Sequence, residues 1–572
     1  MILNSQMFDK IKQRILGGIF NNKTQSITSA AILIGAASLA SRLLGMVRQR
    51  MLVGAFGAGD RLDAYFAAFQ IPDFAFNLLI LATLSVAFIP VFCDYLNRDK
   101  KEAWRIANSI LNLTIIVMGL LSFGLFLLAP QFVKLISPGF SGQKYQMTVG
   151  LTRILVLSPW LFSISSVFSS ILNSFKSFTL VAIAPLLYNL GIIFGILFLA
   201  PVWGIYGVAA GVILGALLHI LIQIPGAKKF GFFWQAVIDL KNRGVREISK
   251  LILPRILSLD VSQISQLVGT VIASTLVAGS VAIFNLVYNI EAVPIGIFAI
   301  SFVVSVFPSL SHHVAREDRE KFRQDFSYTA RQILFFLVPL TILTFIFRAQ
   351  IVRLIIGTQN LSWDETRLAA GALAIFAFSF VFQGISPLLS RSFFALKNSL
   401  IPLLASLLSI AVNVGSTYLF LNLLERDGAL VNHVISLLKL NGLTDIRLLA
   451  LPFGFSLASF FNTIILSSLL RKFFGPLGGK KIIVALLKYL AAGLVAGVVG
   501  YAGLYFVEPF LDTHTFFGIF LQLLFATLIA TAAFVLVSLF LKSEEMINLA
   551  AALRRKVFKT EEYVGVGETE EL

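Results

Sequence analysis

The sequence predicts an all-α polytopic membrane protein with about 14 transmembrane helices. Of its 572 residues, 57% are hydrophobic and only 13% are charged, whereas a soluble domain carries roughly 25% charged residues. Apolar runs of about 20 residues, long enough to cross the hydrocarbon core, recur along the whole chain. The runs lack the alternation of a membrane barrel. This composition excludes a soluble enzyme and a disordered regulator, and the single cysteine, Cys93, excludes an internal disulfide.

Each predicted span is justified by an apolar run with few charges. The runs lie near residues 27–53, 62–93, 106–130, 147–172, 179–199, 205–226, 251–275, 282–311, 327–347, 368–390, 399–422, 448–470, 482–505 and 516–541. Pro72 and Pro294 stand inside the second and eighth runs, where a proline removes a helical hydrogen bond. We therefore expect a kink or a break in these two spans.

The net charge of +17 is explained by topology rather than by nucleic acid. With fourteen spans, the connections on the side of the N-terminus hold 31 Lys and Arg, and the opposite connections hold 9. Basic residues accumulate in cytoplasmic loops. The asymmetry therefore supports the count of fourteen and predicts that both termini are cytoplasmic.

Three segments outside the spans have the pattern of membrane-surface pieces. Residues 1–26 form a basic amphipathic N-terminal segment rather than a cleaved signal peptide. Aromatic residues precede a basic stretch in 229–247, and the loop 425–447 has an apolar face. All three are expected to pack at the membrane surface without a specific partner.

An internal duplication organises the chain. Pro90 and Pro308 occupy matching places in similar stretches, and the short basic turns at Lys176 and Lys397 repeat with nearly the same offset, 221 against 218 residues. A repeat of six spans inserts both halves with the same orientation, as in secondary transporters whose substrate site lies between the halves. The predicted parts are a segment 1–26, an N-lobe 27–226 (spans one to six), a cytoplasmic interfacial linker 227–250, a C-lobe 251–472 (spans seven to twelve), two C-terminal spans 473–541 and a cytoplasmic tail 542–572.

Charges inside the first two spans are the main candidates for function, because a charge in the bilayer is costly. Span one carries Ser41, Arg42 and Arg48, with Gly45 between the arginines to permit a local bend, and Asp63 begins span two. In one interpretation, Asp63 and one arginine neutralise each other as an architectural pair. Alternatively, the guanidinium groups hold an anion, since they match phosphate and diphosphate oxygens bidentately.

Further polar residues lie in spans seven and eight. Glu291 stands inside span eight with Asn285 and Asn289 on neighbouring turns, and Gln263 and Gln266 lie in span seven. Glu291 is a candidate for binding a cation or a proton, or for pairing with a basic residue of the first half. The amides are candidates for lining a cavity, although amides between helices often serve packing.

The sequence contains no enzymatic motif. The stretch Gly57–Asp60 follows no strand and is read as a turn, and His312 and His313 lack acidic partners at metal-ligand spacing. We therefore predict no catalytic residue, no metal site and no cofactor, and leave open a coupling ion or the membrane potential as the energy source.

Several motifs resemble the MurJ (MviN) lipid II flippases. They are ASRLLGMVRQRMLVGAFGAGDRLDAYFAAFQIPDF (40–74), AFIPVF (87–92), ILNSFKSFTLVAIAPLLYNLGII (171–193), VSQIS (261–265), FPSLS (307–311) and FFALKNSLIP (393–402). The resemblance runs in order from residue 27 to about 540. It implies the multidrug/oligosaccharidyl-lipid/polysaccharide exporter fold, with two six-helix lobes and two extra helices.

The resemblance also implies a substrate and site residues. The family's Ser-Arg and second arginine of span one fall on Ser41, Arg42 and Arg48, and its span-two aspartate falls on Asp63. The implied substrate is undecaprenyl-diphosphate-linked peptidoglycan precursor, a sugar-peptide lipid moved from the inner to the outer leaflet. The chain departs from the family at several positions. Gln49 stands where many members have an acid, and Asn289 stands where the family has an arginine in span eight. In span two, Phe76 and Asn77 replace an arginine pair, and Leu81, Ala82 and Thr83 replace a Glu-Gly-Ala stretch.

The hypothesis is therefore a lipid II flippase that works by alternating access in the bacterial cytoplasmic (inner) membrane. Arg42 and Arg48 would hold the diphosphate, and Asp63 would orient an arginine or release the substrate. The bilayer and the cell-wall synthesis machinery are the expected partners, and nucleic acid is not. The alternatives are an exporter of another polyprenyl-linked oligosaccharide, a cation-coupled drug antiporter of the same fold, and a membrane scaffold without transport.

Overall fold

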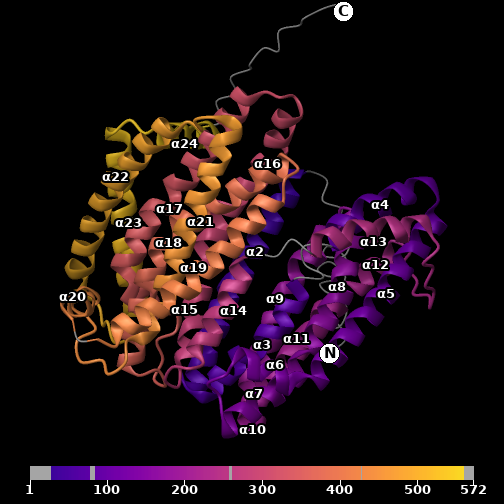
Figure 1. Ribbon diagram of the computed structural model, residues 1–572, viewed down its shortest axis with the longest axis horizontal. Helices are drawn as coiled ribbons and strands as arrows, with labels where there is room; N and C mark the ends of the chain where they lie inside the picture. The colour runs from indigo at the N-terminus through magenta and orange to yellow at the C-terminus, as the bar shows by residue number, and fades with distance from the viewer. Residues whose placement is uncertain (1–26, 78–83, 257–260, 427, 559–572) are drawn as a thin grey trace, which may run out of the picture. The chain divides into compact units, whose positions relative to one another are not determined.

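The computed structural model describes residues 27–77, 84–256, 261–426 and 428–558, and these ranges contain helices and no strand (Figure 1). The first helices are α2 (Ile27–Phe56), α3 (Asp60–Phe76), α4 (Leu84–Arg98), α5 (Lys100–Leu127), α6 (Ala129–Ile136), α7 (Gly142–Leu155), α8 (Leu157–Ser174), α9 (Phe178–Phe194), α10 (Ala200–Trp203), α11 (Ile205–Leu221), α12 (Ile224–Lys229), α13 (Arg243–Ile256) and α14 (Val261–Ala273). They are followed by α15 (Ser280–Pro294), α16 (Ile300–Ala315), α17 (Arg319–Ile355), α18 (Trp363–Ala395), α19 (Leu400–Leu424), α20 (Ala429–Leu438), α21 (Ala450–Phe474), α22 (Gly479–Val507), α23 (Phe516–Phe540) and α24 (Glu544–Phe558).

Eleven of the described helical stretches are long and apolar enough to cross a membrane. They coincide with eleven of the predicted spans, so the all-helical membrane fold is confirmed. The first predicted span falls on α2, the second on α3 and α4, and the seventh on α13 and α14. Each of these three regions includes or adjoins residues outside the described ranges, so the full count of fourteen stays a prediction. The predicted amphipathic segment 1–26 also lies outside the described residues.

The chain divides into two compact units. The first comprises Met1–Tyr288, Ile355–Ala372 and Asn413–Leu451, and the second comprises Asn289–Leu354, Leu373–Val412 and Pro452–Leu572. The lobe boundaries predicted from the repeat stay predictions.

Glycine allows two helices of the first unit to pack backbone against backbone. Gly191 and Gly195, at the end of α9 and the start of its π-helical continuation (Gly195–Leu199), face Gly211 and Gly215 of α11. A Cβ on Gly211 would lie 2.6 Å from the Cα of Gly195, closer than real side chains approach. Small residues at such crossings let helices associate inside a membrane through close van der Waals contact.

Replacing Gly211 by alanine is expected to destabilise the protein by about 1–3 kcal/mol, since the extra methyl group forces two backbones apart. Thermal unfolding of the purified protein in detergent measures this effect. Gly124 of α5 is the matched control, because nothing lies within 4 Å of the Cβ position there. A Gly124→Ala variant that loses as much stability as Gly211→Ala would contradict the close-packing explanation.

The predicted linker piece after α12 is bound along α5 by two asparagines. Asn108 donates to the carbonyl of Phe233 and accepts from the backbone N–H of Gln235. Asn112 donates to the carbonyls of Gln235 and Val237 and accepts from the indole of Trp234. These bonds satisfy backbone groups that a non-helical segment would otherwise leave open. The segment therefore has a defined path, with the rings of Phe233 and Trp234 exposed.

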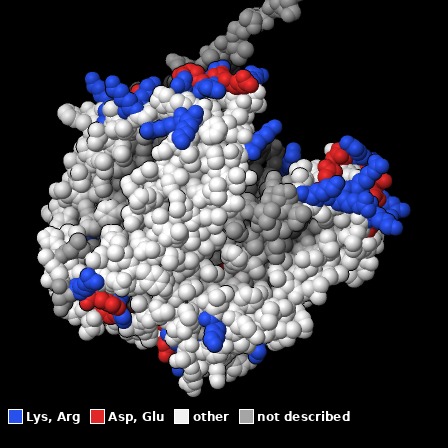
Figure 2. Space-filling view, in the orientation of Figure 1, with Lys and Arg blue, Asp and Glu red and all other residues white. Residues whose placement is uncertain are grey.

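The second unit is completed by the C-terminal pair α22 and α23. Gly493 and Gly497 of α22 lie against Ile342 of α17, and Gly500 lies against Ala530 of α23. The helix after this pair, α24, contacts α17 through ion pairs of Glu544 and Glu545 with Arg331. Figure 2 shows that charged side chains gather at the ends of the helices and that the flank between these ends is largely uncharged. This distribution is expected of helices that face hydrocarbon along their length.

The two turns that the sequence pairs in the internal duplication have a form of helix end that also occurs at Glu317, Lys439 and Lys542. Lys176 and Lys397 both have positive φ, 57° and 58°. Ser177 N–H donates to the carbonyl of Leu172, and Asn398 N–H donates to the carbonyl of Phe393, so both turns have the hydrogen bond of a Schellman cap. The two positions that the sequence pairs therefore share one backbone geometry.

The two expected proline distortions have different outcomes. Pro294 ends α15 and is followed by a π-helical turn, Ile295–Ala299, before α16 begins. This confirms a distortion in the eighth span. Pro72 is buried inside α3, which ends at Phe76 next to residues outside the described ranges.

The loop 425–447 contains the helix α20, where Leu438 is buried and Leu437 is exposed.

Candidate functional site

The polar side chains of α2 meet an asparagine of α9. Arg48 donates a hydrogen bond of 3.0 Å to Oδ1 of Asn189. The Nδ2 of the same amide donates to Oγ of Ser41 at 3.2 Å. Ser41 and Arg48 are two helical turns apart and therefore share one face of α2. We name Ser41, Arg48 and Asn189 the arginine cluster.

Gly45 lies beside the asparagine of this cluster. Helix α2 continues through Gly45 without a break, and the local bend expected there stays a prediction. The Cβ position of Gly45 lies 3.8 Å from Oδ1 of Asn189. A methyl group at this position would make an ordinary van der Waals contact with the asparagine, so the space beside Asn189 does not require glycine.

An acid and two phenols surround the arginine cluster. Arg48 acts electrostatically on Asp73 and Tyr65 of α3 and on Tyr188 of α9. Asp73 is exposed although it stands near the middle of the predicted second span. Arg42, six residues before Arg48, is half-buried and forms no ion pair with another described residue. Because six residues do not complete a whole number of helical turns, Arg42 lies on another face of α2 than Arg48, and the arginine cluster itself holds one guanidinium group, which acts on Asp73.

Asp63 does not pair with an arginine in the described structure, which corrects the architectural pairing considered from the sequence. Its Oδ2 lies 2.7 Å from Nζ of Lys144, a residue of α7. The carboxylate also accepts the backbone N–H groups of Gly279 and Ala282, each at 2.7 Å. Asp63 is therefore a buried N-terminal cap of α15, where the unpaired N–H groups and the helix dipole favour a negative charge.

The connection between α2 and α3, just before Asp63, is tightly packed. The Cβ position of Gly279 lies 2.4 Å from the carbonyl oxygen of Ala58, and Gly279 has a φ of +90°. Asn360 donates to the carbonyl of Gly54 at 2.6 Å. These contacts fix the connection between α2 and α3 at the start of α15.

The predicted amides of spans seven and eight join two helices to α3. Oδ1 of Asn285 accepts from Nε2 of Gln266 and from Nε2 of Gln70, each at 3.1 Å. Asn285 is buried, and its own amide donates to the carbonyl of Val281. Such bonds between helices serve packing. Gln263 is half-buried on α14, and Asn289 is exposed on α15.

Glu291 is buried and is bound by two side chains of α18. Its Oε1 accepts from Oγ of Ser379 at 3.3 Å and from Nε2 of Gln383. Only 1% of Glu291 is exposed, and no ion pair between described residues includes it. The predicted partnership with a basic residue is therefore not found within the described chain.

Substitution of Glu291 should separate shape from charge. We expect Glu291→Gln to keep the stability of the wild type, since a neutral amide of the same shape still accepts both hydrogen bonds. Glu291→Ala should cost about 1–3 kcal/mol, because Gln383 and Ser379 lose a buried partner. Thermal unfolding in detergent measures both. An equal loss in the two variants would contradict this prediction and indicate that the charge itself stabilises the fold.

Sequence reasoning missed several residues of these sites, among them the four that follow. Lys144 lies in a stretch read as an external connection, and Asn189 and Gln383 are single amides in apolar runs. Asp73 carried a signal that could have been used, since it is an acid inside a predicted span directly after Pro72. No group of three or more His, Cys, Asp or Glu that could hold a metal occurs among the described residues.

The chain is similar to known flippases over most of its length. A model of the family described as lipid II flippase MurJ matches residues 52–526. The probable lipid II flippase MurJ of Borreliella burgdorferi is 27% identical over 400 residues, which cover 69% of this chain and 79% of the relative. The lipid II flippase MurJ of Burkholderia cenocepacia is 25% identical over 408 residues, covering 70% and 79%.

Solved structures agree on the fold. A lipid II flippase MurJ in an inward closed conformation aligns with a TM-score of 0.69 at 22% identity and covers 89% of this chain and 99% of that one. An inward-facing multidrug resistance MATE family transporter of the MOP superfamily aligns with a TM-score of 0.60 at 16% identity, covering 78% and 99%. Because the family match extends over most of the residues, the chain belongs to the lipid II flippase MurJ family.

Proposed function

We propose that the chain flips lipid II, the undecaprenyl-diphosphate-linked peptidoglycan precursor, from the inner to the outer leaflet of the bacterial cytoplasmic membrane. Membership of the family carries this proposal. The eleven apolar helices agree with a multi-pass membrane location. The excess of basic residues in alternate connections supports an orientation with both termini in the cytoplasm.

Arg48 of the arginine cluster and Arg42, which lies outside the cluster on α2, supply the guanidinium groups for the diphosphate. Arg42 lies about 22 Å along α2 at 1.5 Å per residue, too far from the helix start for its charge to reach water easily. A guanidinium group offers paired N–H donors that match two phosphate oxygens, and such charge-assisted bonds are stronger than neutral ones. Asn189 orients Arg48, so that part of the cost of ordering this side chain is met before the substrate binds.

Asp63 and Glu291 have other parts in this proposal. Asp63 affects transport by holding α15 in place, because its carboxylate caps the N-terminal end of this helix. Glu291 is the candidate for a coupling proton or cation, since a buried carboxyl without a basic partner is costly to ionise. The two lobes would alternate access to the arginines from the two sides of the membrane.

Expression in a bacterium depleted of its own lipid II flippase tests the proposal. The wild-type chain should restore growth, and reconstituted vesicles should move labelled lipid II to the opposite leaflet. Failure of both, with full-length protein in the membrane, would contradict the assignment of lipid II. Transport of another polyprenyl-diphosphate sugar by the same vesicles would then redirect the proposal to that substrate.

A further inference from the structure

Asp73 is an acid inside a predicted span, and its carboxylate has no bonded partner among the described residues. It stands thirteen residues after the start of α3, about 20 Å along the helix. No hydrogen bond or ion pair between described residues reaches the carboxylate. Because a charge at this depth of a membrane is costly, its presence requires an explanation.

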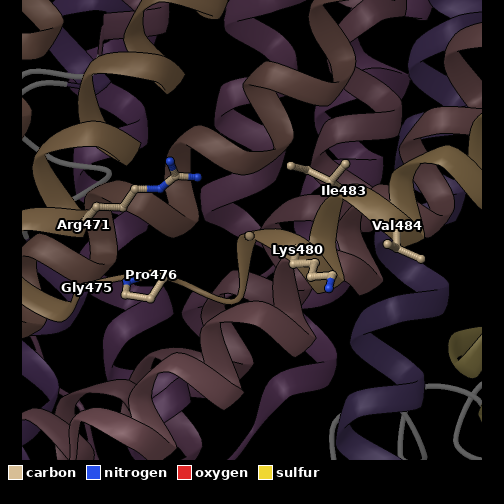
Figure 3. A pocket seen from close by; sticks show the side chains of 7 residues that line it. Arg471, Gly475, Pro476, Lys480, Ile483 and Val484 are labelled. Atoms are coloured by element: carbon tan, nitrogen blue, oxygen red, sulfur yellow. The ribbon is translucent and has the colours of Figure 1, made fainter.

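Asp73 differs in this respect from charged residues at the ends of helices. Arg471 and Lys480, for example, line a groove of about 650 Å³ at the turn between α21 and α22 (Figure 3). Both are exposed near the ends of their helices, where a long basic side chain keeps its charge in water. Asp73 has a short side chain and lies far from the start of α3, so its charge must be balanced inside the protein.

The neighbouring turns of α3 show which way Asp73 faces. Residues three apart are neighbours on the surface of a helix, so Asp73 lies between Gln70 and Phe76. Gln70 donates to Asn285 of α15. The ring of Phe76 packs on Phe162 of α8, with 5.6 Å between the centroids. Asp73 therefore faces the interior of the first unit, between the directions of α15 and α8, rather than hydrocarbon.

The same ring contacts lead to the arginine cluster. Phe162 also packs on Tyr188 of α9, with 4.9 Å between the centroids, and the next residue of α9 is the asparagine that binds Arg48. Arg48 acts electrostatically on Asp73, although no ion pair between described residues joins the two. The charged and titratable groups within electrostatic reach of this carboxylate in the described structure are Arg48 of α2, Tyr188 of α9 and, on its own helix, Tyr65.

A diphosphate at the arginine cluster would compete with Asp73 for the charge of Arg48. While the cluster holds no anion, the guanidinium group lowers the cost of an ionised carboxylate nearby. A bound diphosphate takes up that positive charge and adds negative charge beside Asp73, and a like charge favours the protonated carboxyl group. A magnesium ion suits this place less well than a proton, because it requires octahedral oxygen coordination and would be repelled by Arg48.

We propose that Asp73 takes up one proton when lipid II binds at the arginine cluster and returns it to water when lipid II leaves. The inference rests on the proposed function, since lipid II supplies the competing diphosphate. The proton adds to a carboxylate oxygen, and no other bond changes. Because binding is linked to proton uptake, the affinity for lipid II falls as the pH rises, by up to about tenfold per pH unit for one proton.

Binding of lipid II to the purified full chain in detergent, measured from mildly acidic to mildly basic pH, tests the proposal. The wild type should bind more weakly at each step towards basic pH. Asp73→Asn has the shape of the protonated carboxyl group and should bind tightly throughout. Titration of the phosphates of lipid II affects both proteins, so the difference between their slopes belongs to Asp73. The matched control is Asp60→Asn, which removes a 59% exposed carboxylate from the start of the same helix and should keep the wild-type slope.

Proton uptake on addition of lipid II, recorded with a pH indicator in weakly buffered solution, provides a second measurement that needs no variant. The wild type should take up close to one proton per lipid II bound, and Asp73→Asn clearly less. No uptake by the wild type, equal pH slopes of wild type and Asp73→Asn, or weaker binding by Asp73→Asn at every pH would each overturn the proposal. Recovery of wild-type binding at basic pH on addition of millimolar Mg²⁺ would overturn it in favour of a metal ion. Absence of lipid II binding at every pH would contradict the proposed function as well, whereas binding that does not depend on Asp73 would contradict this inference alone.

Discussion

Replacing Arg48 by alanine is expected to abolish rescue of a flippase-depleted bacterium and to slow lipid II translocation in vesicles by about 10- to 100-fold. This range follows from losing one charge-assisted hydrogen bond, worth about 1.5–3 kcal/mol. The substitution also leaves Oδ1 of Asn189 without its donor. The same loss of rescue is expected for Arg42→Ala. Growth complementation and vesicle translocation measure both.

Three variants control the Arg48 prediction. Arg61→Ala removes an exposed arginine at the start of α3 and should keep full rescue. Arg48→Lys keeps the charge without the paired donors, so its rate should lie between those of wild type and Arg48→Ala. Asn189→Leu keeps Arg48 but removes the group that orients it, and should slow transport less. Full rescue by Arg48→Ala and Arg42→Ala would refute the arginine site while leaving the family assignment intact.

Replacing Asp63 by alanine is expected to cause a larger loss of stability than any other single change considered above. The carboxylate is 1% exposed, pairs with Lys144 and caps two N–H groups of α15. Its removal leaves the N–H groups of Gly279 and Ala282 without their acceptor, at about 1–3 kcal/mol for each buried unsatisfied group, and takes from Lys144 the buried one of its two acidic partners. The midpoint of thermal unfolding in detergent should therefore fall clearly below that of the wild type.

Asp60 offers a matched control for Asp63. It pairs with the same Lys144 nitrogen at 2.8 Å, but its side chain is 59% exposed. An exposed pair contributes about 0–1 kcal/mol, so Asp60→Ala should change the midpoint little. Equal destabilisation by Asp60→Ala and Asp63→Ala would show that burial and the α15 cap do not set the strength of this interaction.

The membrane fold could be predicted because its signal is local. Each spanning helix carries its own apolar run, and a chain in hydrocarbon must satisfy its backbone groups within the segment. The paired turns at Lys176 and Lys397 were likewise readable, since a short repeated stretch forms the same cap in both places.

The site could be predicted only in part. The rarity of charge within the spans identified Arg42, Arg48, Asp63 and Glu291 as residues that needed an explanation. Their partners were not readable, because Asn189 is 141 positions from Arg48 and Lys144 is 81 positions from Asp63. The predicted pairing of Asp63 with an arginine is wrong, because its carboxylate caps the N-terminus of α15 and pairs with Lys144 instead.

The sequence by itself determined the helical membrane architecture, the asymmetry of basic residues and the family, since each is set by patterns along the chain. Only the tertiary structure decided which polar groups meet. It bound Arg48 to Asn189, Asp63 to the start of α15, and Glu291 to Ser379 and Gln383. The physical reason is that each apolar run is stabilised by the same hydrocarbon environment, so its own composition is sufficient to predict a spanning helix. A buried polar group instead depends on the particular partner that packing brings within hydrogen-bonding distance.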